Sequence, residues 1–215
     1  MRVLVVDDHA LFREGLRLLL LSQPGLACEV AASADAGLQL ARSGPDYDVV
    51  LLDWHMEGLS GADAIRAFRE VAQESRIVVV SAEKSAGLVR AAVEAGAAGF
   101  IPKESSPEVL EQALQKIAAG GIYLPSALLA SGGESQRPAG AGPRTLDAAF
   151  PGLTPRQIDV LAAVLKGVSN KVIARQLGIS DATVKSHLSV IFRELSVQSR
   201  TEAVYVAARQ GVSIA

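Results

Sequence analysis

The alternation of two residue patterns over residues 1 to about 121 constrains the fold of this chain more than any other feature. Short runs that are apolar throughout alternate with stretches of helical periodicity. Continuous apolar runs are typical of strands buried on both faces of a parallel sheet, with helices as the crossover connections. We expect strands at Arg2–Val6, Cys28–Ser33, Tyr47–Asp53, Arg76–Ala82 and Gly99–Pro102. The pattern predicts five β/α pairs, a (βα)5 doubly wound α/β domain.

Two of the connecting helices have distinct signals. The helix after the first strand is marked by the i, i+4, i+7, i+8 spacing of Leu11, Gly15, Leu18 and Leu19. Before the last helix, Ser106 is a favourable N-cap and Pro107 suits the first helical position, while Gly120 and Gly121 end the helix. We therefore place the end of the first domain at residue 121.

The remainder of the chain changes in character. Ser131–Arg144 holds four Gly, two Pro and two Ser without apolar periodicity, which predicts a flexible linker within 122–150. Beyond it we expect four short helices at Pro155–Lys166, Asn170–Leu177, Asp181–Leu195 and Arg200–Gln210. Capping-box patterns begin at Thr154 and Ser199. Residues 151–215 are thus predicted to form a small all-α domain.

Charge and cysteine content narrow the function classes. The net charge of −2 conceals 11 Lys/Arg against 17 Asp/Glu in residues 1–125, and 8 against 4 in residues 151–215. An acidic front and a basic back suggest different partners for the two domains. The single cysteine cannot form an internal disulfide, and no apolar run reaches the length of a membrane span. We expect a cytoplasmic protein without a membrane segment.

Polar residues lie at or just after the ends of four predicted strands: Asp7-Asp8, Asp53, Ser81 and Lys103. Ligands of doubly wound sheets bind outside the carboxyl ends of the strands, so these side chains should converge. Three carboxylates close together repel one another unless a cation joins them, and oxygen ligands favour Mg²⁺. The backbone carbonyl of His55 could complete the ligand set.

With Asp7 and Asp8 neutralised by the cation, the Asp53 carboxylate can act as a nucleophile toward a phosphoryl group. Lys103 would supply a positive charge to the phosphoryl oxygens, and Ser81 a hydroxyl donor. Taken singly, each residue has an ordinary alternative role, such as a helix N-cap or a solvated strand end. Their joint occurrence at successive strand ends indicates a phosphoacceptor site.

The segments Val5-Val6-Asp7-Asp8-His9, Leu51-Leu52-Asp53-Trp54-His55-Met56, Val80-Ser81-Ala82 and Gly99-Phe100-Ile101-Pro102-Lys103 resemble the receiver domain of two-component response regulators. The resemblance implies that Asp53 is the phosphoacceptor, that Asp7 and Asp8 hold Mg²⁺, and that Ser81 and Phe100 form a conformational switch. Two departures from the family pattern are Glu57, where proline is usual, and Phe100, where tyrosine is commoner.

The predicted helix at Asp181–Leu195 has an apolar stripe formed by Val184, Leu188, Ile191 and Leu195, with small and basic residues on its other faces. From the stripe alone, an ordinary amphipathic helix of a bundle is favoured over a helix that enters the major groove of DNA. The order of residues changes that balance. Leu153–Gln157, Ser169–Lys171, Leu177–Ser180, Thr183–His187 and Ser199–Val204 resemble the LuxR-type helix-turn-helix.

Together the two resemblances indicate the NarL/FixJ class of response regulators. They imply base contacts from Lys185, Ser186 and Ser189, and phosphate contacts from Lys171, Thr183 and Arg200. They also imply a sensor histidine kinase, double-stranded DNA and a homodimer in the active state as partners, with RNA polymerase as a further candidate.

Three functions follow as hypotheses. The leading one is a transcription factor gated by phosphorylation of Asp53, which acts through dimerisation or unmasking of the basic domain. Such a chain is no enzyme beyond phosphorylation and dephosphorylation of its own Asp53. The second is a phosphohydrolase with continuous turnover, and the third a DNA-binding regulator controlled by a partner or by dimerisation without phosphorylation.

Overall fold

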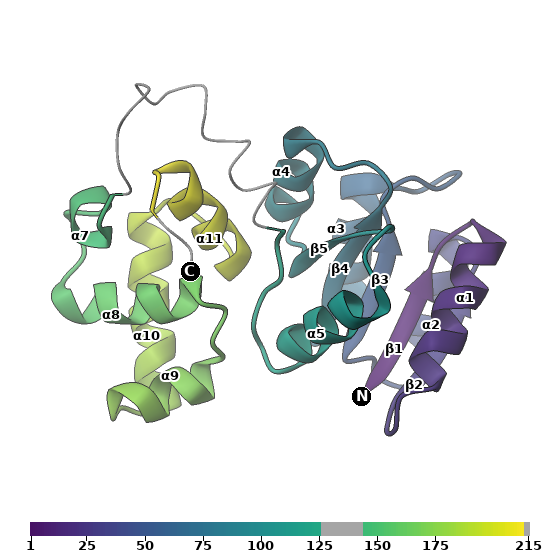
Figure 1. The fold of residues 1–215 in the computed structure, drawn as a ribbon, viewed down its shortest axis with the longest axis horizontal. Helices are drawn as coiled ribbons and strands as arrows, with labels where there is room; N and C mark the ends of the chain where they lie inside the picture. The colour runs from purple at the N-terminus through teal and green to yellow at the C-terminus, as the bar shows by residue number, and fades with distance from the viewer. Residues whose placement is uncertain (126–143, 213–215) are drawn as a thin grey trace. The chain divides into compact units, whose positions relative to one another are not determined.

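The computed structural model describes residues 1–125 and 144–212, and the chain divides into two compact units, Met1–Ala118 and Ala119–Ala215 (Figure 1). Most of the predicted linker, residues 126–143, lies outside the described residues. Among the residues described, no helix combines the length and the apolar character that crossing a membrane requires.

Within the described part of the first unit, five strands form one parallel sheet in the order β2-β1-β3-β4-β5. The strands are β1 (Arg2–Val6), β2 (Ala27–Ala31), β3 (Val49–Asp53), β4 (Arg76–Ser81) and β5 (Gly99–Pro102). All of β3, and β1 and β4 beyond their first residues, are buried, as expected for a sheet covered on both faces. The predicted (βα)5 fold is confirmed.

Five helices cover the sheet: α1 (Ala10–Leu21), α2 (Ala34–Ser43), α3 (Gly61–Val71), α4 (Ala86–Glu94) and α5 (Pro107–Ala118). Figure 1 shows α1 and α5 in front of the sheet, with α2 and α3 behind it. Helix α3 also contacts both α2 and α4. The first and the last helix of the unit therefore share one face.

One strand and three helices end earlier than the sequence predicted, because the last predicted residues act as helix caps. The predicted strand Cys28–Ser33 ends at Ala31, because Ser33 is instead the N-cap of α2 and accepts a hydrogen bond from the backbone N–H of Ala36 at 3.2 Å. Three predicted C-terminal helices end one residue earlier, since Lys166, Leu195 and Gln210 are their C-caps.

Helix α1 forms where it was predicted, but two of its marker residues are on the solvent side. Leu16 and Leu20 are its buried residues, whereas Leu11 is 90% exposed and Leu18 62% exposed. A stripe of helical periodicity identifies a helix without fixing which side the sheet covers.

The described helices of the second unit are α7 (Leu146–Ala149), α8 (Pro155–Leu165), α9 (Asn170–Leu177), α10 (Asp181–Glu194) and α11 (Arg200–Arg209). The capping box at Thr154 forms with both of its hydrogen bonds. At α11 one of the two forms, since the Glu202 N–H donates to Ser199 Oγ, but the Glu202 carboxylate accepts from the N–H of Gln198. The four predicted helices are present, and α7 was missed.

The core of the second unit includes residues that the sequence prediction assigned to the linker. Ile122 is 4% exposed and Phe150 9% exposed, and both join the apolar cluster of α8 to α11, with Leu124 packed against it. The predicted boundaries at 121 and 151 stay predictions. The packing nevertheless connects the residues that follow α5 to the helical core.

Candidate functional site

Four of the predicted strand-end residues, Asp7, Asp53, Ser81 and Lys103, converge at the carboxyl edge of the sheet. The ladder brings Val6 opposite Leu52, Asp53 opposite Val80, and Ser81 opposite Pro102. Each functional side chain therefore stands at or just beyond the last pair of its strand. Asp7 is 1% exposed, Asp53 2% and Ser81 0%, and these three form most of the buried polar residues of the described chain. Buried polar groups in this number require partners.

Lys103 supplies the charge partner of the carboxylates. Its Nζ lies 2.7 Å from Asp7 Oδ2 and 2.8 Å from Asp53 Oδ2, and 4.7 Å from the centre of the Phe12 ring. Burial alone would lower the pKa of Lys103, but the hydrogen bonds with Asp53 and Asp7 and their negative charges raise it above its usual value. Lys103 therefore remains a cation beside Asp53.

The pKa of the Asp53 carboxyl is shifted by its surroundings. Burial raises the pKa of Asp53 above its usual value and the charge of Asp7 adds to the rise, while the hydrogen bond from Lys103 lowers it. The backbone N–H of His55 donates to Asp53 Oδ1 at 3.3 Å. Ionised Asp53 is thus held in an environment that favours additional positive charge.

The donor set fits a hard divalent cation. Asp7 Oδ2 and Asp8 Oδ1 are buried, and their close neighbours are ion-pair partners: Lys103 Nζ at 2.7 Å from Asp7 Oδ2 and His9 Nδ1 at 2.9 Å from Asp8 Oδ1. Asp7, Asp8, His9 and Asp53 offer ligand atoms that all lie within 4.8 Å of one another. Clustered carboxylate oxygens are what Mg²⁺ or Ca²⁺ binds. The prediction that the His55 carbonyl joins this set stays a prediction.

The predicted switch residues lie on neighbouring strands. Ser81 ends β4, and its Oγ accepts a hydrogen bond from the backbone N–H of Glu83 at 3.1 Å. Phe100, on β5, is fully buried. The Ser81 hydroxyl hydrogen remains able to donate to a group placed on Asp53, since its oxygen here acts as the acceptor.

Sequence analysis missed two histidine contacts at this site. His9 lies among the carboxylates, with its Nδ1 2.9 Å from Asp8 Oδ1. The Nε2 of His55 lies 3.1 Å from Glu83 Oε2, and this contact and the Ser85 hydroxyl lower the pKa of Glu83, with Ser85 contributing more. No periodicity signal could have found either contact, because both join loops.

In the second unit, helices α9 and α10 form the predicted helix-turn-helix. Gly178 ends α9 at a φ of 65°, and Ser180 caps α10 by accepting from the N–H of Thr183 at 3.0 Å. Helix α10 buries Val184, Leu188 and Ile191. These three residues define the face of α10 that packs within the second unit.

The predicted DNA contacts divide into two groups. Five are exposed or half-exposed on α9 and α10: Lys171, Thr183, Lys185, Ser186 and Ser189. Arg200 instead turns inward and donates to Asn170 Oδ1 at 3.2 Å and to the carbonyl oxygens of Val164 and Val168. Its prediction as a phosphate contact stays open, but the structure gives Arg200 a role in joining α8, α9 and α11.

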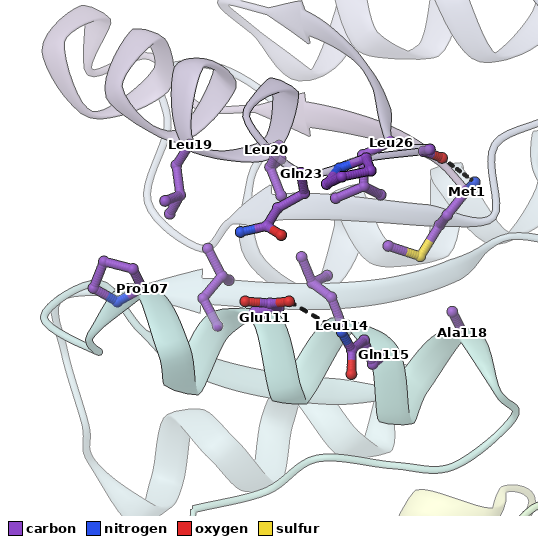
Figure 2. A pocket seen from close by; sticks show the side chains of 13 residues that line it. Met1, Leu19, Leu20, Gln23, Leu26, Pro107, Glu111, Leu114, Gln115 and Ala118 are labelled. Carbon is purple, nitrogen blue, oxygen red and sulfur yellow. Dashed lines mark hydrogen bonds between the residues drawn. The ribbon is translucent and has the colours of Figure 1, made fainter.

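A separate hollow lies between α1 and α5, with a volume of about 560 Å³ (Figure 2). Figure 2 shows Leu19 and Leu20 on one side and Leu114 on the other. Glu111 is the one carboxylate of its lining, and it accepts a hydrogen bond from Gln115 at 3.1 Å. This apolar groove lacks the charged groups that phosphoryl chemistry needs, and the strand-end cluster remains the candidate site.

Comparison with known protein families matches both units. A family described as the response regulator receiver domain matches residues 3–115, and a family described as bacterial regulatory proteins of the luxR family matches residues 151–207. The two matched ranges contain all of the site residues discussed above.

Two relatives match this chain over nearly its whole length, and one solved structure matches over part of it. The glycerol metabolism activator of Pseudomonas putida is 36% identical over 96% of this chain and 94% of its own length. The nitrate/nitrite response regulator protein NarL of Escherichia coli is 36% identical over 94% of this chain and 92% of its own. A solved LuxR family DNA-binding response regulator from Silicibacter pomeroyi is 34% identical, covers 59% of this chain and 98% of its own, and gives a TM-score of 0.53.

Proposed function

The chain belongs to the response regulators that join a receiver domain to a LuxR-type DNA-binding domain, and from this premise we propose that phosphorylation of Asp53 controls its binding to DNA. A single observation carries the proposal. A buried carboxylate, Asp53, lies 2.8 Å from the Lys103 ammonium at an edge that also gathers Asp7 and Asp8.

In the phosphoryl transfer, an Asp53 oxygen forms a bond to phosphorus while the bond from phosphorus to the donor breaks. With a histidine kinase as donor, the imidazole nitrogen departs with the electron pair. Mg²⁺ held by Asp7, Asp8 and the His55 carbonyl would offset the charge on the phosphoryl oxygens. Lys103 keeps its contact with Asp53 and donates a hydrogen bond to one phosphoryl oxygen, and the Ser81 hydroxyl donates to another. The protein is no classical enzyme, and we confine its chemistry to Asp53.

The expected strength of the switch follows from these bonds. Two hydrogen bonds to a charged phosphoryl group are worth roughly 1.5 to 3 kcal/mol each. Moving a population from 1:99 to 99:1 requires about 5.5 kcal/mol. Together the two bonds from Ser81 and Lys103 supply roughly 3 to 6 kcal/mol, which reaches this requirement only at the upper end of the range. They therefore bias the switch strongly, and we expect measurable DNA binding before phosphorylation.

We further propose that the output is DNA binding as a homodimer through α10, with Lys185, Ser186 and Ser189 facing the base edges. Serine is a less selective reader of bases than a bidentate side chain, so Lys185 and DNA shape carry more of the specificity. Helix-turn-helix dimers bind two half-sites about one helical turn apart or a multiple of it, and footprinting measures that spacing.

The decisive experiment measures DNA binding by the full chain. The probe is a duplex that the protein itself selects from a random-sequence pool, and the donor is acetyl phosphate with Mg²⁺. Asp53→Asn is compared with Asp63→Asn, an exposed carboxylate on α3 that pairs with Arg66. We expect the donor to increase binding and self-association of the wild type and of Asp63→Asn, but not of Asp53→Asn.

Equal binding by donor-treated wild type and Asp53→Asn would exclude gating by phosphorylation. In that case the alternative of a regulator controlled by a partner or by dimerisation alone would stand. Rapid multiple turnovers of phosphate release would instead favour a phosphohydrolase.

A further inference from the structure

His9 has an unusual position for a residue at the start of a helix. It is the N-cap of α1, yet its side chain makes no cap hydrogen bond. Its Nδ1 instead faces the carboxylates, at 2.9 Å from Asp8 Oδ1, 3.2 Å from Asp7 Oδ1 and 3.5 Å from Asp53 Oδ2. The backbone N–H of His9 also donates to Asp7 Oδ1 at 2.8 Å, which holds the residue against the cluster.

These three separations have the size of the edges of a coordination polyhedron. Ligands at about 2.1 Å from a metal are roughly 3.0 Å apart in an octahedral site and roughly 3.4 Å apart in a tetrahedral one. The charges also fit, since three carboxylates and the Lys103 ammonium leave two negative charges for a divalent cation. The buried oxygens Asp7 Oδ2 and Asp8 Oδ1 make no hydrogen bond of good geometry, and their close neighbours are the Lys103 ammonium and the His9 ring. Lys103 Nζ also lies 3.5 Å from His9 Nδ1, so a bound cation would take the place of these contacts.

The other histidine of this region is not available to the cluster. His55 directs its Nε2 toward Glu83 Oε2, at 3.1 Å. Of these two histidines, it is therefore His9 whose ring nitrogen is placed as a ligand.

We propose that the His9 imidazole makes the acidic cluster a site for borderline first-row cations such as Co²⁺, Ni²⁺ and Zn²⁺, with Nδ1 as a ligand beside Asp7, Asp8 and Asp53. Imidazole suits these metals, whereas Mg²⁺ prefers oxygen ligands and retained water. Such a cation binds more tightly than Mg²⁺ and competes with it for the same carboxylates. The inference rests on the cation site of the proposed function, but it needs neither phosphorylation nor DNA.

The test uses the full chain without phosphodonor or DNA. Its one tryptophan, Trp54, directly follows Asp53, so its fluorescence reports a paramagnetic ion bound at the cluster. Co²⁺ is titrated alone, and Mg²⁺ is titrated by displacement of Co²⁺, for the wild type, His9→Ala and His9→Gln. His187→Ala is the matched control, since this third histidine lies on α10 in the other unit.

We expect His9→Ala and His9→Gln to bind Co²⁺ about tenfold or more weakly, because even the loss of an indirect partner of a ligand costs that much. Mg²⁺ affinity should stay unchanged in both variants, and His187→Ala should behave as the wild type. In the wild type, Zn²⁺ should shift the ¹⁵N resonance of His9 Nδ1, and this shift must disappear in excess Mg²⁺.

Equal Co²⁺ affinity in wild type and both His9 variants would overturn the inference, and so would an equal loss for Co²⁺ and Mg²⁺. An unchanged Trp54 emission spectrum and unfolding midpoint before metal addition verify that each variant is folded. A Co²⁺ response that depends on His9 without any Mg²⁺ binding would contradict the magnesium site of the proposed function and leave this inference standing.

Discussion

The two units use polar side chains in opposite ways. In the first unit, the groups that carry the chemistry are withdrawn from water, with Asp7, Asp53 and Ser81 buried. In the second, five of the six candidate DNA contacts are at the surface, and Lys185 has a side chain that is 69% exposed. A buried charge affects stability and chemistry together, whereas an exposed one can be removed with little effect on folding. We therefore expect substitutions in the acidic cluster of the first unit to change stability together with function, and substitutions of exposed DNA contacts to change function alone.

The largest effect is expected at Lys103. Lys103→Met leaves Asp7 and Asp53 buried without their counter-charge, and breaking a buried pair in this way costs about 3 to 5 kcal/mol of unfolding free energy. Its side chain is 14% exposed, so solvent offers little compensation. Denaturant unfolding followed by Trp54 fluorescence measures the loss, and Mg²⁺ should recover part of it.

Lys84→Met is the control for that variant, because its pair with Glu104 has exposed side chains and should be worth at most about 1 kcal/mol. If Lys103→Met were as stable as the wild type without divalent cations, the buried charges of the first unit would not dominate its stability.

The next effect concerns the boundary between the units. Ile122 is buried with the helical core, so Ile122→Ala should lower the stability of the second unit by about 2 to 4 kcal/mol. Ile117→Ala, five residues earlier in α5 and fully buried, should weaken the first unit instead. Hydrogen exchange distinguishes the two, as it reports each unit separately. If Ile122→Ala instead lost hydrogen-exchange protection in β3, Ile122 would stabilise the first unit, and this prediction would be wrong.

Arg200 and Lys171 sharpen the comparison within the second unit. Arg200→Ala removes donors to Asn170 Oδ1 and to two carbonyl oxygens, and we expect a loss of about 1 to 3 kcal/mol in unfolding free energy. Lys171→Ala should leave stability unchanged and reduce the salt dependence of DNA binding by about one phosphate contact. Thermal unfolding and DNA titrations at several salt concentrations measure both. The reverse result for Arg200, full stability with a reduced salt slope, would make it a DNA contact.

The smallest effect is at Cys28, an isolated half-buried thiol of β2. Burial raises the pKa of Cys28 to about 11, so the thiolate is scarce at pH 8. Iodoacetamide should then alkylate the folded chain about a hundredfold more slowly than the urea-unfolded chain, and its rate should still rise as the pH approaches 11. A rate that levels off near pH 9 in the folded chain would contradict this.

Sequence reasoning succeeded where the position along the chain determines the position in space. A residue that follows a buried parallel strand must lie at one edge of the sheet, so Asp7, Asp53, Ser81 and Lys103 could be brought together from their order alone. The fold of each unit followed equally from periodicity and capping residues.

It failed where side-chain direction decides. Leu11 and Leu18 share a helical stripe but face solvent, and Arg200 occupies a position typical of a surface contact but turns inward. The contact of His9 with the carboxylates depends on the direction of its side chain at the start of α1. The helix α7 spans four residues, too few for a periodic signal. The direction of a side chain depends on tertiary packing, and neither the spacing of residues nor their local order predicts it.

The strand order β2-β1-β3-β4-β5 also has a kinetic consequence. Every neighbouring pair in this sheet is parallel and separated by a crossover, so the first unit must close a long loop for each strand that it adds. The described helices of the second unit follow one another after short turns and need fewer distant contacts. After dilution from denaturant, the DNA-binding unit is therefore expected to regain its structure first, before the acidic cluster is assembled.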